Sequence, residues 1–331
     1  MLAVAVENVE PVLHMTTLLL ILPVRWAPIW LAPLREAAPA HGLSNLNLIV
    51  HGKDAYAPGD IDYALGFRPD AGLLGSLPKL KAIFSLGAGV DGFLSDAAFP
   101  KHVPLVRFVN PALSLEMAQY CVLHTLIHHR RFRATLAAQA EHKWTQAMPE
   151  KGTAKTGVGI LGFGEIGIMA GERLRDLGFA VAGWSRTKKD VPGIESFAGE
   201  AALGPFLARS DILICLLPLT PETRGVLNRR LFAQLPKGAY LINAARGAHQ
   251  VEADVIAALN EGQLSGASLD VFETEPLPKD NPLWAHPKII VTPHNAGLSD
   301  PIAAAQSVAA GIAAAERGEP LKNVVDTARG Y

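Results

Sequence analysis

The sequence predicts an α/β protein with two domains, each a parallel β-sheet covered by helices. The chain has 331 residues, which is long for one compact core. Short apolar runs alternate with longer segments along the chain, as parallel strands joined by crossovers require. A glycine-rich turn, Gly162 to Gly167, follows one apolar run and precedes a helical segment. That context indicates the start of a βαβ unit.

The first part of the chain is expected to form a flavodoxin-like domain. Five apolar runs are candidate strands, and residues 1–14 are an extension ahead of the first of them. Asn110-Pro111 is a turn, and residues 113–133 are expected to form one long helix. The candidate strands are residues 17–22, 46–50, 63–67, 82–86 and 105–108.

From Gly157 onward the alternation is denser and indicates a doubly wound Rossmann domain. A helix over 166–177 ends at Gly178, and an alanine-rich helix over 299–316 is expected to return to the first domain. The predicted domains are therefore 1–112 plus 298–331, which is discontinuous, and 113–297, which is inserted into it. The candidate strands are residues 157–161, 179–184, 212–217, 239–242, 268–271 and 289–292.

Composition narrows the class of protein. Hydrophobic residues make up 49% of the chain, charged residues 18%, and the formal net charge is −1. This balance lacks the basic excess of a nucleic-acid-binding protein. Cys121 and Cys215 stand in apolar runs and indicate buried thiols in a reducing compartment. Without a basic n-region or a long uninterrupted apolar run, a cytoplasmic protein with no membrane or nucleic-acid partner is expected.

The turn G-x-G-x-x-G predicts a dinucleotide site. Gly162 permits a tight turn, Gly164 lets backbone approach a pyrophosphate, and Gly167 lets the helix pack on the strand. Glu165 and Ile166 stand at the helix start, where free N–H groups and the helix dipole favour phosphate. An ordinary glycine turn is the weaker interpretation in this strand-to-helix context.

The end of the next predicted strand favours NADPH over NADH. An NAD site needs a carboxylate about 20 residues downstream of the glycines, and Ser185 stands at that position. Arg186 and Lys188 follow it and could hold a 2′-phosphate, which a carboxylate would repel. A solvated basic loop would explain the charges alone. Because the carboxylate of an NAD site is missing at Ser185, the sequence predicts NADPH as the preferred cofactor and NADH as a possible one.

Arg246, Glu275 and His294 stand in separate segments that follow strands in the last third of the chain. An arginine can grip a carboxylate and polarise a carbonyl. A histidine can donate a proton near neutral pH, and a carboxylate can orient its ring. Each residue alone could be structural. Together, after strands of one Rossmann sheet, they predict hydride and proton transfer on a 2-oxo or 2-hydroxy acid.

With these motifs, the chain resembles the D-isomer-specific 2-hydroxyacid dehydrogenases, and within them the glyoxylate/hydroxypyruvate reductase A subgroup. The resemblance starts near Thr17 and covers nearly the whole chain. It rests on specific sequence words: LGAGVD at 86–91, WSR at 184–186, TPET at 220–223, NAARG at 243–247, LDVFETEPLP at 269–278 and TPH at 292–294.

The resemblance implies further roles. The family's catalytic arginine, glutamate and histidine fall on Arg246, Glu275 and His294, and its nicotinamide-contacting aspartate falls on Asp270. Members are usually homodimers that close around the cofactor, and Trp144 either reaches over a neighbouring subunit's pocket or is an ordinary packing residue. The resemblance also implies cofactor contacts at Leu217, Pro218, Thr223 and Ala244, and backbone contacts to the substrate carboxylate at Gly87, Ala88, Gly89 and Val90.

His124 and His128 have the i, i+4 spacing of a metal site, and His129 is adjacent. No acidic residue completes a set in this apolar helical run, so a packed or interface helix with no metal is expected. His249 and His286 are expected to be loop residues, with His249 near the edge of the cleft.

The sequence therefore predicts an enzyme that reduces small 2-oxo acids with NADPH, converting glyoxylate to glycolate and hydroxypyruvate to D-glycerate. The small substrates follow from the resemblance alone. Two alternatives remain: a dehydrogenase of the same family for a bulkier 2-oxo acid, and a non-catalytic dinucleotide-sensing protein like the corepressors built on this fold.

Overall fold

The computed structural model describes residues 15–330, so the predicted extension over 1–14 lies outside the described residues. The chain divides into two compact units. Unit 1 ends at Phe108 and resumes over Pro301–Thr327, and unit 2 comprises Val109–Asp300 and the chain from Ala328. The sequence-based boundaries differ by a few residues, because the helix that begins at Pro111 lies wholly in unit 2 and the helix that begins at Pro301 lies wholly in unit 1.

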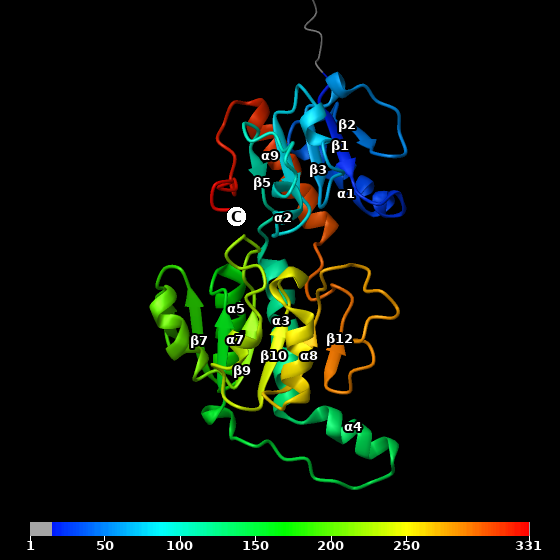
Figure 1. The fold of residues 1–331 in the computed structure, drawn as a ribbon. Helices are drawn as coiled ribbons and strands as arrows, with labels where there is room; N and C mark the ends of the chain where they lie inside the picture. Colours follow the sequence, from blue (N-terminus) through cyan, green and yellow to red (C-terminus); the bar gives the residue numbers. More distant parts are fainter. Residues whose placement is uncertain (1–14, 331) are drawn as a thin grey trace, which may run out of the picture. The chain divides into compact units, whose positions relative to one another are not determined.

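Unit 1 contains a five-stranded parallel sheet in the order β2-β1-β3-β4-β5, which is the flavodoxin-like order (Figure 1). Strand β1 lies between β2 and β3, so Leu18 is opposite Leu48 on one side and Tyr63 on the other, and all five residues of β1 are buried. The strands are β1 Thr17–Ile21, β2 Asn47–Val50, β3 Tyr63–Gly66, β4 Ala82–Ser85 and β5 Leu105–Val106.

Helices from both ends of the chain cover the sheet of unit 1. Helix α1 spans Ala27–Ala40, α2 spans Asp91–Leu94, and α9 spans Pro301–Glu316. A Cβ on Gly311 would lie 2.6 Å from the Phe84 ring, so glycine lets α9 approach β4 closely. The Tyr63 hydroxyl donates to Glu316 Oε1 at 2.6 Å and fastens the end of α9 to β3. These contacts join the two chain segments of unit 1, since α9 comes from the second segment and β3 and β4 from the first.

Unit 2 contains a seven-stranded parallel sheet in the order β12-β11-β10-β9-β6-β7-β8. Counted from β6, this is the doubly wound 3-2-1-4-5-6 order of a Rossmann domain with one further strand. The strands are β6 Gly157–Leu161, β7 Ala180–Ser185, β8 Glu195–Ala198, β9 Ile212–Cys215, β10 Ala239–Asn243, β11 Leu264–Leu269 and β12 Ile289–Val291.

Helices pack on both faces of the sheet in unit 2 and enclose two apolar cores. The helix predicted over 113–133 is wrong in extent. Helix α3 ends at His129, Arg131 takes a left-handed conformation with φ of 53°, and a separate helix α4 begins. The helices are α3 Pro111–His129, α4 Phe132–Ala140, α5 Glu165–Asp176, α6 Leu203–Leu207, α7 Arg229–Phe232 and α8 Glu252–Asn260.

Two strand predictions need correction. Strand β8 was missed because it is an edge strand with partly exposed side chains and no apolar run. Strand β11 ends at Leu269 instead of running over 268–271, so Asp270 lies just beyond it. Its first half contains Ser265 and Gly266, where a Cβ on Gly266 would lie 2.7 Å from the Tyr240 ring. Close packing there demands small residues, which hides the strand from a hydrophobicity pattern.

Across residues 15–330, none of the helices combines the length and the apolar character that a membrane crossing needs.

Candidate active site

The predicted site residues of unit 2 gather at one edge of its sheet. Carboxyl ends of parallel strands share an edge, which is where ligands bind in doubly wound folds. Each strand from β6 to β12, apart from the edge strand β8, is followed there by a predicted site residue. These residues are Gly162 after β6, Ser185 at the end of β7, Leu217 after β9, Arg246 after β10, Asp270 after β11 and His294 after β12.

The glycine-rich turn fits a pyrophosphate. Gly162 has a φ of 107°, and a Cβ there would lie 2.5 Å from the carbonyl carbon of Leu216. A Cβ on Gly167 would lie 2.3 Å from the Gly162 carbonyl oxygen, so this position needs glycine for packing. A Cβ on Gly164 would meet nothing within 4 Å. The backbone at Gly164 therefore faces open space, as close approach by a ligand requires.

Helix α5 starts directly after this turn. Gly164 is its N-cap and supplies no side-chain cap, while Glu165 is exposed and Ile166 is partly buried in the first turn. The first N–H groups of a helix have no partner within the helix and carry the positive end of its dipole. This helix start fits an anionic group beside Gly164.

The end of β7 carries positive charge. Arg186 and Lys188 are exposed, and the Ser185 hydroxyl donates to the Thr187 carbonyl oxygen at 2.7 Å. On the opposite loop, a hydrogen bond from Thr220 and then the charge of Arg186 hold the pKa of Glu222 below its usual value. Arg186 thus has a carboxylate in its electrostatic neighbourhood.

A second loop of the cofactor edge is fixed from two sides. Leu217 and Ala244 are buried, and the Thr223 hydroxyl donates to the Pro218 carbonyl oxygen at 2.8 Å. His249 Nδ1 accepts the Arg246 N–H at 3.2 Å, so its Nε2 carries the proton and lies 3.3 Å from the same Pro218 oxygen. The expectation that His249 edges the cleft is wrong, because its side chain is fully buried between two loops.

Arg246 follows β10 on a tightly held turn. The Asn243 side-chain amide donates to the Arg246 carbonyl oxygen at 3.2 Å and to Gln250 Oε1 at 2.9 Å. The guanidinium Nη1 donates to the Ala245 carbonyl oxygen at 2.8 Å, which sets the direction of this planar group with its five N–H donors. A Cβ on Gly247 would lie 1.8 Å from the Phe272 carbonyl carbon, so this glycine is required for close packing.

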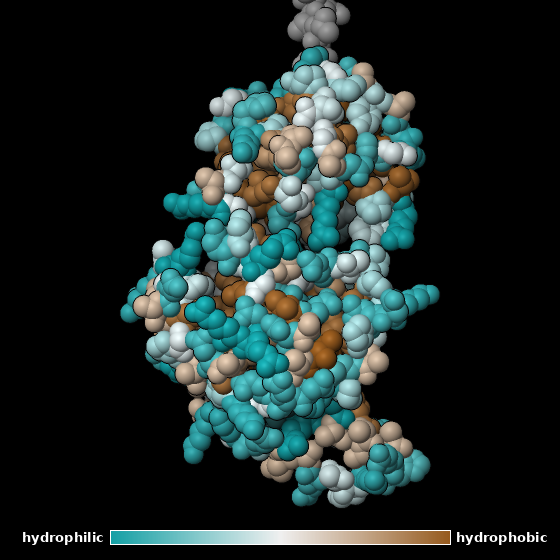
Figure 2. Space-filling view, in the orientation of Figure 1, coloured by the Kyte–Doolittle hydropathy of each residue, from teal (hydrophilic) through white to brown (hydrophobic). Residues whose placement is uncertain are grey.

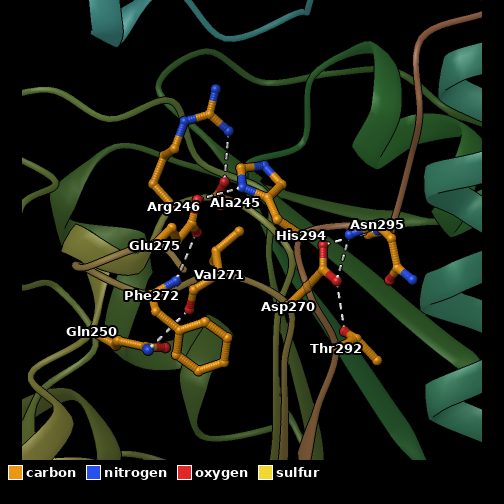
Figure 3. A network of polar contacts seen from close by, with 11 residues as sticks. Ala245, Arg246, Gln250, Asp270, Val271, Phe272, Glu275, Thr292, His294 and Asn295 are labelled. Carbon is orange, nitrogen blue, oxygen red and sulfur yellow. Dashed lines mark hydrogen bonds and ion pairs between the residues drawn. The ribbon is translucent and has the colours of Figure 1, made fainter. Parts of the chain in front are cut away.

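His294 and Glu275 form a direct pair. His294 Nδ1 lies 2.8 Å from Glu275 Oε2, and Glu275 Oε1 accepts the Phe272 N–H at 3.0 Å. The two side chains are 32% and 18% exposed, so the pair is partly shielded yet reachable. Figure 3 shows the imidazole and the Arg246 guanidinium projecting to the same side. Since a carboxylate only accepts hydrogen bonds, Nδ1 carries the proton in this contact.

Asp270 is buried and supports the segment that contains His294 (Figure 3). Its carboxylate accepts the Thr292 hydroxyl at 2.6 Å and the Asn295 and Ala296 N–H groups at 3.0 and 2.9 Å. Burial raises the pKa of Asp270, and these hydrogen bonds and the charge of His294 oppose the rise.

The predicted substrate loop lies in unit 1, at the carboxyl end of β4. Gly87 donates its N–H to the Ser85 hydroxyl at 3.2 Å, and its carbonyl oxygen accepts the Phe108 N–H at 3.2 Å. Gly87 therefore shapes the loop. Ala88 and Gly89 are partly exposed and Val90 is buried, so the N–H donors open to a ligand belong to the residues after Gly87.

The histidines of α3 pack against the sheet of unit 2. His124 Nδ1 lies 2.7 Å from the Ser268 hydroxyl oxygen, and His128 stacks on Tyr240 with ring centroids 4.1 Å apart. His129 Nε2 lies 3.2 Å from the Thr153 hydroxyl oxygen, and His286 is a partly exposed loop residue. In the described part of the chain, no three His, Cys, Asp or Glu side chains group as metal ligands.

A comparison with known protein families identifies the family of the chain that carries this site. Residues 122–296, more than half of the chain, match the family model described as D-isomer specific 2-hydroxyacid dehydrogenase, NAD binding domain. The chain belongs to the D-isomer-specific 2-hydroxyacid dehydrogenase family.

Two relatives within this family are named glyoxylate/hydroxypyruvate reductase A. The protein from Serratia proteamaculans is 42% identical over 310 residues, which cover 91% of this chain and 96% of the relative. The protein from Klebsiella pneumoniae (strain 342) is 44% identical over 275 residues, which cover 82% of this chain and 88% of the relative.

Solved structures of the family have the same fold. A 2-hydroxyacid dehydrogenase from Xanthobacter autotrophicus Py2, in complex with NADPH and MES, matches 96% of this chain and all of its own. Its TM-score is 0.88 at 40% identity. An NADPH-dependent glyoxylate/hydroxypyruvate reductase from Sinorhizobium meliloti, in complex with NADP and sulfate, matches 96% of this chain and all of its own, with a TM-score of 0.87 at 38% identity.

Sequence reasoning missed the residues that hold the dehydrogenase loops in place. Asn243, Gln250 and His249 fix the Arg246 turn, while Thr292 fixes Asp270. Tyr120, on α3, lies 2.8 Å from Thr292 through its hydroxyl. The available signal was its spacing, since Tyr120, His124 and His128 stand at i, i+4 and i+8 and share one helix face.

Proposed function

We propose that this family member reduces small 2-oxo acids, glyoxylate and hydroxypyruvate, with NADPH. The observation that carries the proposal is the His294–Glu275 pair, which holds the imidazole on the same side as the Arg246 guanidinium. The substrates named for the similar proteins of Serratia proteamaculans and Sinorhizobium meliloti support the choice of small acids.

The chemistry assigned to the chain's own residues has two parts. Arg246 binds the substrate carboxylate through its planar guanidinium, which can donate two parallel hydrogen bonds. Protonated His294 donates the proton on Nε2 to the carbonyl oxygen and keeps the proton on Nδ1 against Glu275. NADPH, when bound, supplies the hydride to the carbonyl carbon. In the reverse direction, neutral His294 accepts the proton.

Several residues fit NADPH. The open backbone at Gly164 and the start of α5 suit the pyrophosphate. Arg186 and Lys188 suit the 2′-phosphate, with no acidic side chain at Ser185 to repel it. The complexes of similar proteins with NADPH and NADP support this cofactor. Asp270 is proposed to contact the nicotinamide amide, and Leu217, Pro218, Thr223 and Ala244 are proposed to line the cofactor cleft.

The two units are proposed to bind different ligands, one the dinucleotide and the other the substrate. Unit 2 is the dinucleotide-binding domain, which agrees with the family model over 122–296. Unit 1 is the substrate-binding domain and offers the N–H groups after Gly87 to the substrate carboxylate. The predicted boundaries, 1–112 plus 298–331 and 113–297, remain proposals for the functional domains.

The deciding experiment is an initial-rate assay with NADPH, and separately NADH, against glyoxylate, hydroxypyruvate, pyruvate and a phenyl-substituted 2-oxo acid. Fast NADPH-dependent turnover of the first two acids is the expected result. Preference for the phenyl-substituted acid would keep the mechanism and overturn the substrate. Tight dinucleotide binding without turnover of any acid would favour a sensing protein.

A homodimer is part of the proposal. Helix α4 and the segment after it lie below the sheet of unit 2 in the view of Figure 1. No residue of α4 is buried, and the helix and this segment expose large apolar side chains. Phe132, Leu136 and Met148 are about half or more exposed, and Trp144 is 97% exposed, so Trp144 does not pack within its own chain. Tan residues mark this segment at the lower end of unit 2 in Figure 2.

Sedimentation velocity tests the dimer directly. Phe132→Ser with Leu136→Ser should shift the wild-type dimer to monomer, because association depends on burial of this apolar face. A wild-type monomer at micromolar concentration would contradict the proposal. A cytoplasmic location is also proposed, on the strength of two buried free thiols, Cys121 and Cys215, which suit a reducing compartment.

A further inference from the structure

Asp270 holds three successive N–H groups of the chain segment 294–296. Its carbonyl oxygen accepts the His294 N–H at 2.8 Å. Its carboxylate accepts the Asn295 and Ala296 N–H groups at 3.0 and 2.9 Å. One buried residue therefore determines the path of the backbone on both sides of the His294 Cα.

This path needs to be held. His294 has a φ of 52°, in the left-handed region that residues with a Cβ enter at a cost. Such a conformation persists only where the surroundings enforce it. The hydrogen bonds that this segment donates to Asp270 are the enforcing contacts, and they set where the imidazole projects.

A chain of two donors reaches Asp270 from helix α3. The Thr292 hydroxyl donates its single hydrogen to Asp270 Oδ1 at 2.6 Å. The Tyr120 hydroxyl, 2.8 Å from Thr292 Oγ1, must therefore be the donor in that contact. Burial raises the pKa of Tyr120, so the phenol keeps the proton it donates. Hydrogen bonds in such a chain polarise one another, and Tyr120 strengthens the bond from Thr292.

We propose that Tyr120 is a positioning residue for the reaction, which acts through Thr292 and Asp270 to hold the backbone of His294. This inference rests on the proposed role of His294 as the proton donor. Tyr120 contacts neither the imidazole nor, in the proposed site, the substrate. Its contribution is to keep the His294 side chain in the geometry that proton transfer needs.

Strand β10, which packs against α3, offers a matched control. Tyr240 is also buried, and its hydroxyl lies 2.7 Å from the Ser268 hydroxyl, which in turn lies 2.7 Å from His124 Nδ1. This second chain of hydroxyl contacts ends on α3 and includes no residue of the segment 294–296. Tyr120→Phe and Tyr240→Phe remove the same atom from similar surroundings, so the difference between them isolates the effect on His294.

The first measurement is amide hydrogen exchange in the full-length, ligand-free protein. Tyr120→Phe and Thr292→Val should accelerate exchange over 294–296 by roughly 3- to 10-fold, the effect of losing one net hydrogen bond. Thr292→Ser, which keeps the hydroxyl, and Tyr240→Phe should exchange as the wild type does. Equal exchange over 294–296 in the Tyr120→Phe and Tyr240→Phe variants would overturn the inference, even if Thr292→Val fails to fold.

The second measurement is steady-state kinetics with NADPH and glyoxylate. Tyr120→Phe should lower kcat by roughly 3- to 10-fold, with an unchanged dissociation constant for NADPH, while Tyr240→Phe keeps the wild-type kcat. Equal kcat in the two variants would overturn the inference and leave the proposed function intact. A wild type without turnover would overturn the proposed function, and the exchange data would still decide whether Tyr120 holds the segment.

Discussion

Nδ1 of His294 lies 2.8 Å from Oε2 of Glu275, while Oε1 of the same carboxylate accepts the Phe272 N–H at 3.0 Å. Both carboxylate oxygens are therefore used, one to anchor Glu275 to its own loop and one to hold the imidazole. An imidazole held in this way cannot flip without losing a charge-assisted hydrogen bond. The contact thus fixes the orientation of the imidazole.

Replacement of either partner should reduce turnover to different extents. His294→Ala removes the proton donor, and we expect kcat to fall by roughly 10²- to 10⁴-fold with NADPH binding retained. Glu275→Gln keeps the shape but replaces the charge-assisted hydrogen bond that orients the imidazole with a weaker neutral one, so kcat should fall by a smaller factor than in His294→Ala. Steady-state kcat with glyoxylate and NADPH, compared between the two variants and the wild type, measures this. Near-normal kcat in His294→Ala would refute the role.

Arg246→Lys tests the carboxylate grip without loss of charge. An ammonium cannot donate two parallel hydrogen bonds to a carboxylate as a guanidinium does. We expect KM for glyoxylate to rise by roughly 10- to 100-fold and kcat to fall, as loss of a hydrogen bond to a charged group implies. The NADPH dissociation constant serves as the control and should stay unchanged. An unchanged KM would mean that other groups hold the carboxylate.

Most of the fold was predictable because its strands are buried on both faces. Strands such as β1, β6 and β9 appear in the sequence as short uninterrupted apolar runs, since each is fully buried. The pattern fails where burial is partial, at the edge strand β8, and where crowding demands small residues, in β11. The break between α3 and α4 depends on the left-handed Arg131, which hydrophobic periodicity does not reveal.

The sequence predicted the site residues whose side-chain type the reaction itself requires. It did not predict the residues that only hold those side chains in position. Arg246, Glu275 and His294 have side chains that the reaction needs, and they follow strands of one sheet. Tyr120 contacts Thr292, 172 positions away in the chain, and His249 contacts Pro218, 31 positions away. Such contacts exist only after folding. Sequence motifs therefore identified the reacting groups, and the structure was needed to identify the residues that position these groups.

Arg186→Ala tests the cofactor choice. If the guanidinium binds the 2′-phosphate, its loss should raise KM for NADPH by roughly 10- to 100-fold, the range for a lost charge-assisted hydrogen bond, and leave KM for NADH within about threefold. Lys188→Ala is the companion variant, with a smaller effect expected from a point charge without a planar fork. An equal rise in KM for both cofactors would show that Arg186 does not bind the 2′-phosphate.

Glu222→Gln should act in the opposite direction. The carboxylate of Glu222 lies in the electrostatic neighbourhood of Arg186, and its negative charge opposes a phosphate that approaches the same guanidinium. Removal of this exposed charge should lower KM for NADPH by roughly two- to fivefold at low salt and leave NADH unaffected. The same comparison at high salt is the control, because screening should abolish the difference. A gain for both cofactors alike would contradict the explanation.

The stability of the protein should decline in mild acid because of the histidines on α3. Burial lowers the pKa of His124 and of His128 to about 4, against 6.5 for an unperturbed histidine. Between these values the unfolded chain binds protons that the folded chain does not. The free energy of unfolding should therefore fall as the pH drops from 6.5 to 4, by at most about 1.4 kcal/mol per pH unit for each histidine.

His128→Phe isolates one of the two contributions. Phenylalanine can keep the stack on Tyr240, whose ring centroid lies 4.1 Å from that of His128, but it does not titrate. Urea unfolding at several pH values from 4.5 to 7.5 should show a shallower acid loss in this variant than in the wild type. His102→Gln, at an exposed position, is the control and should follow the wild-type curve. Parallel curves for His128→Phe and the wild type would show that His128 titrates in the folded protein as it does in the unfolded chain.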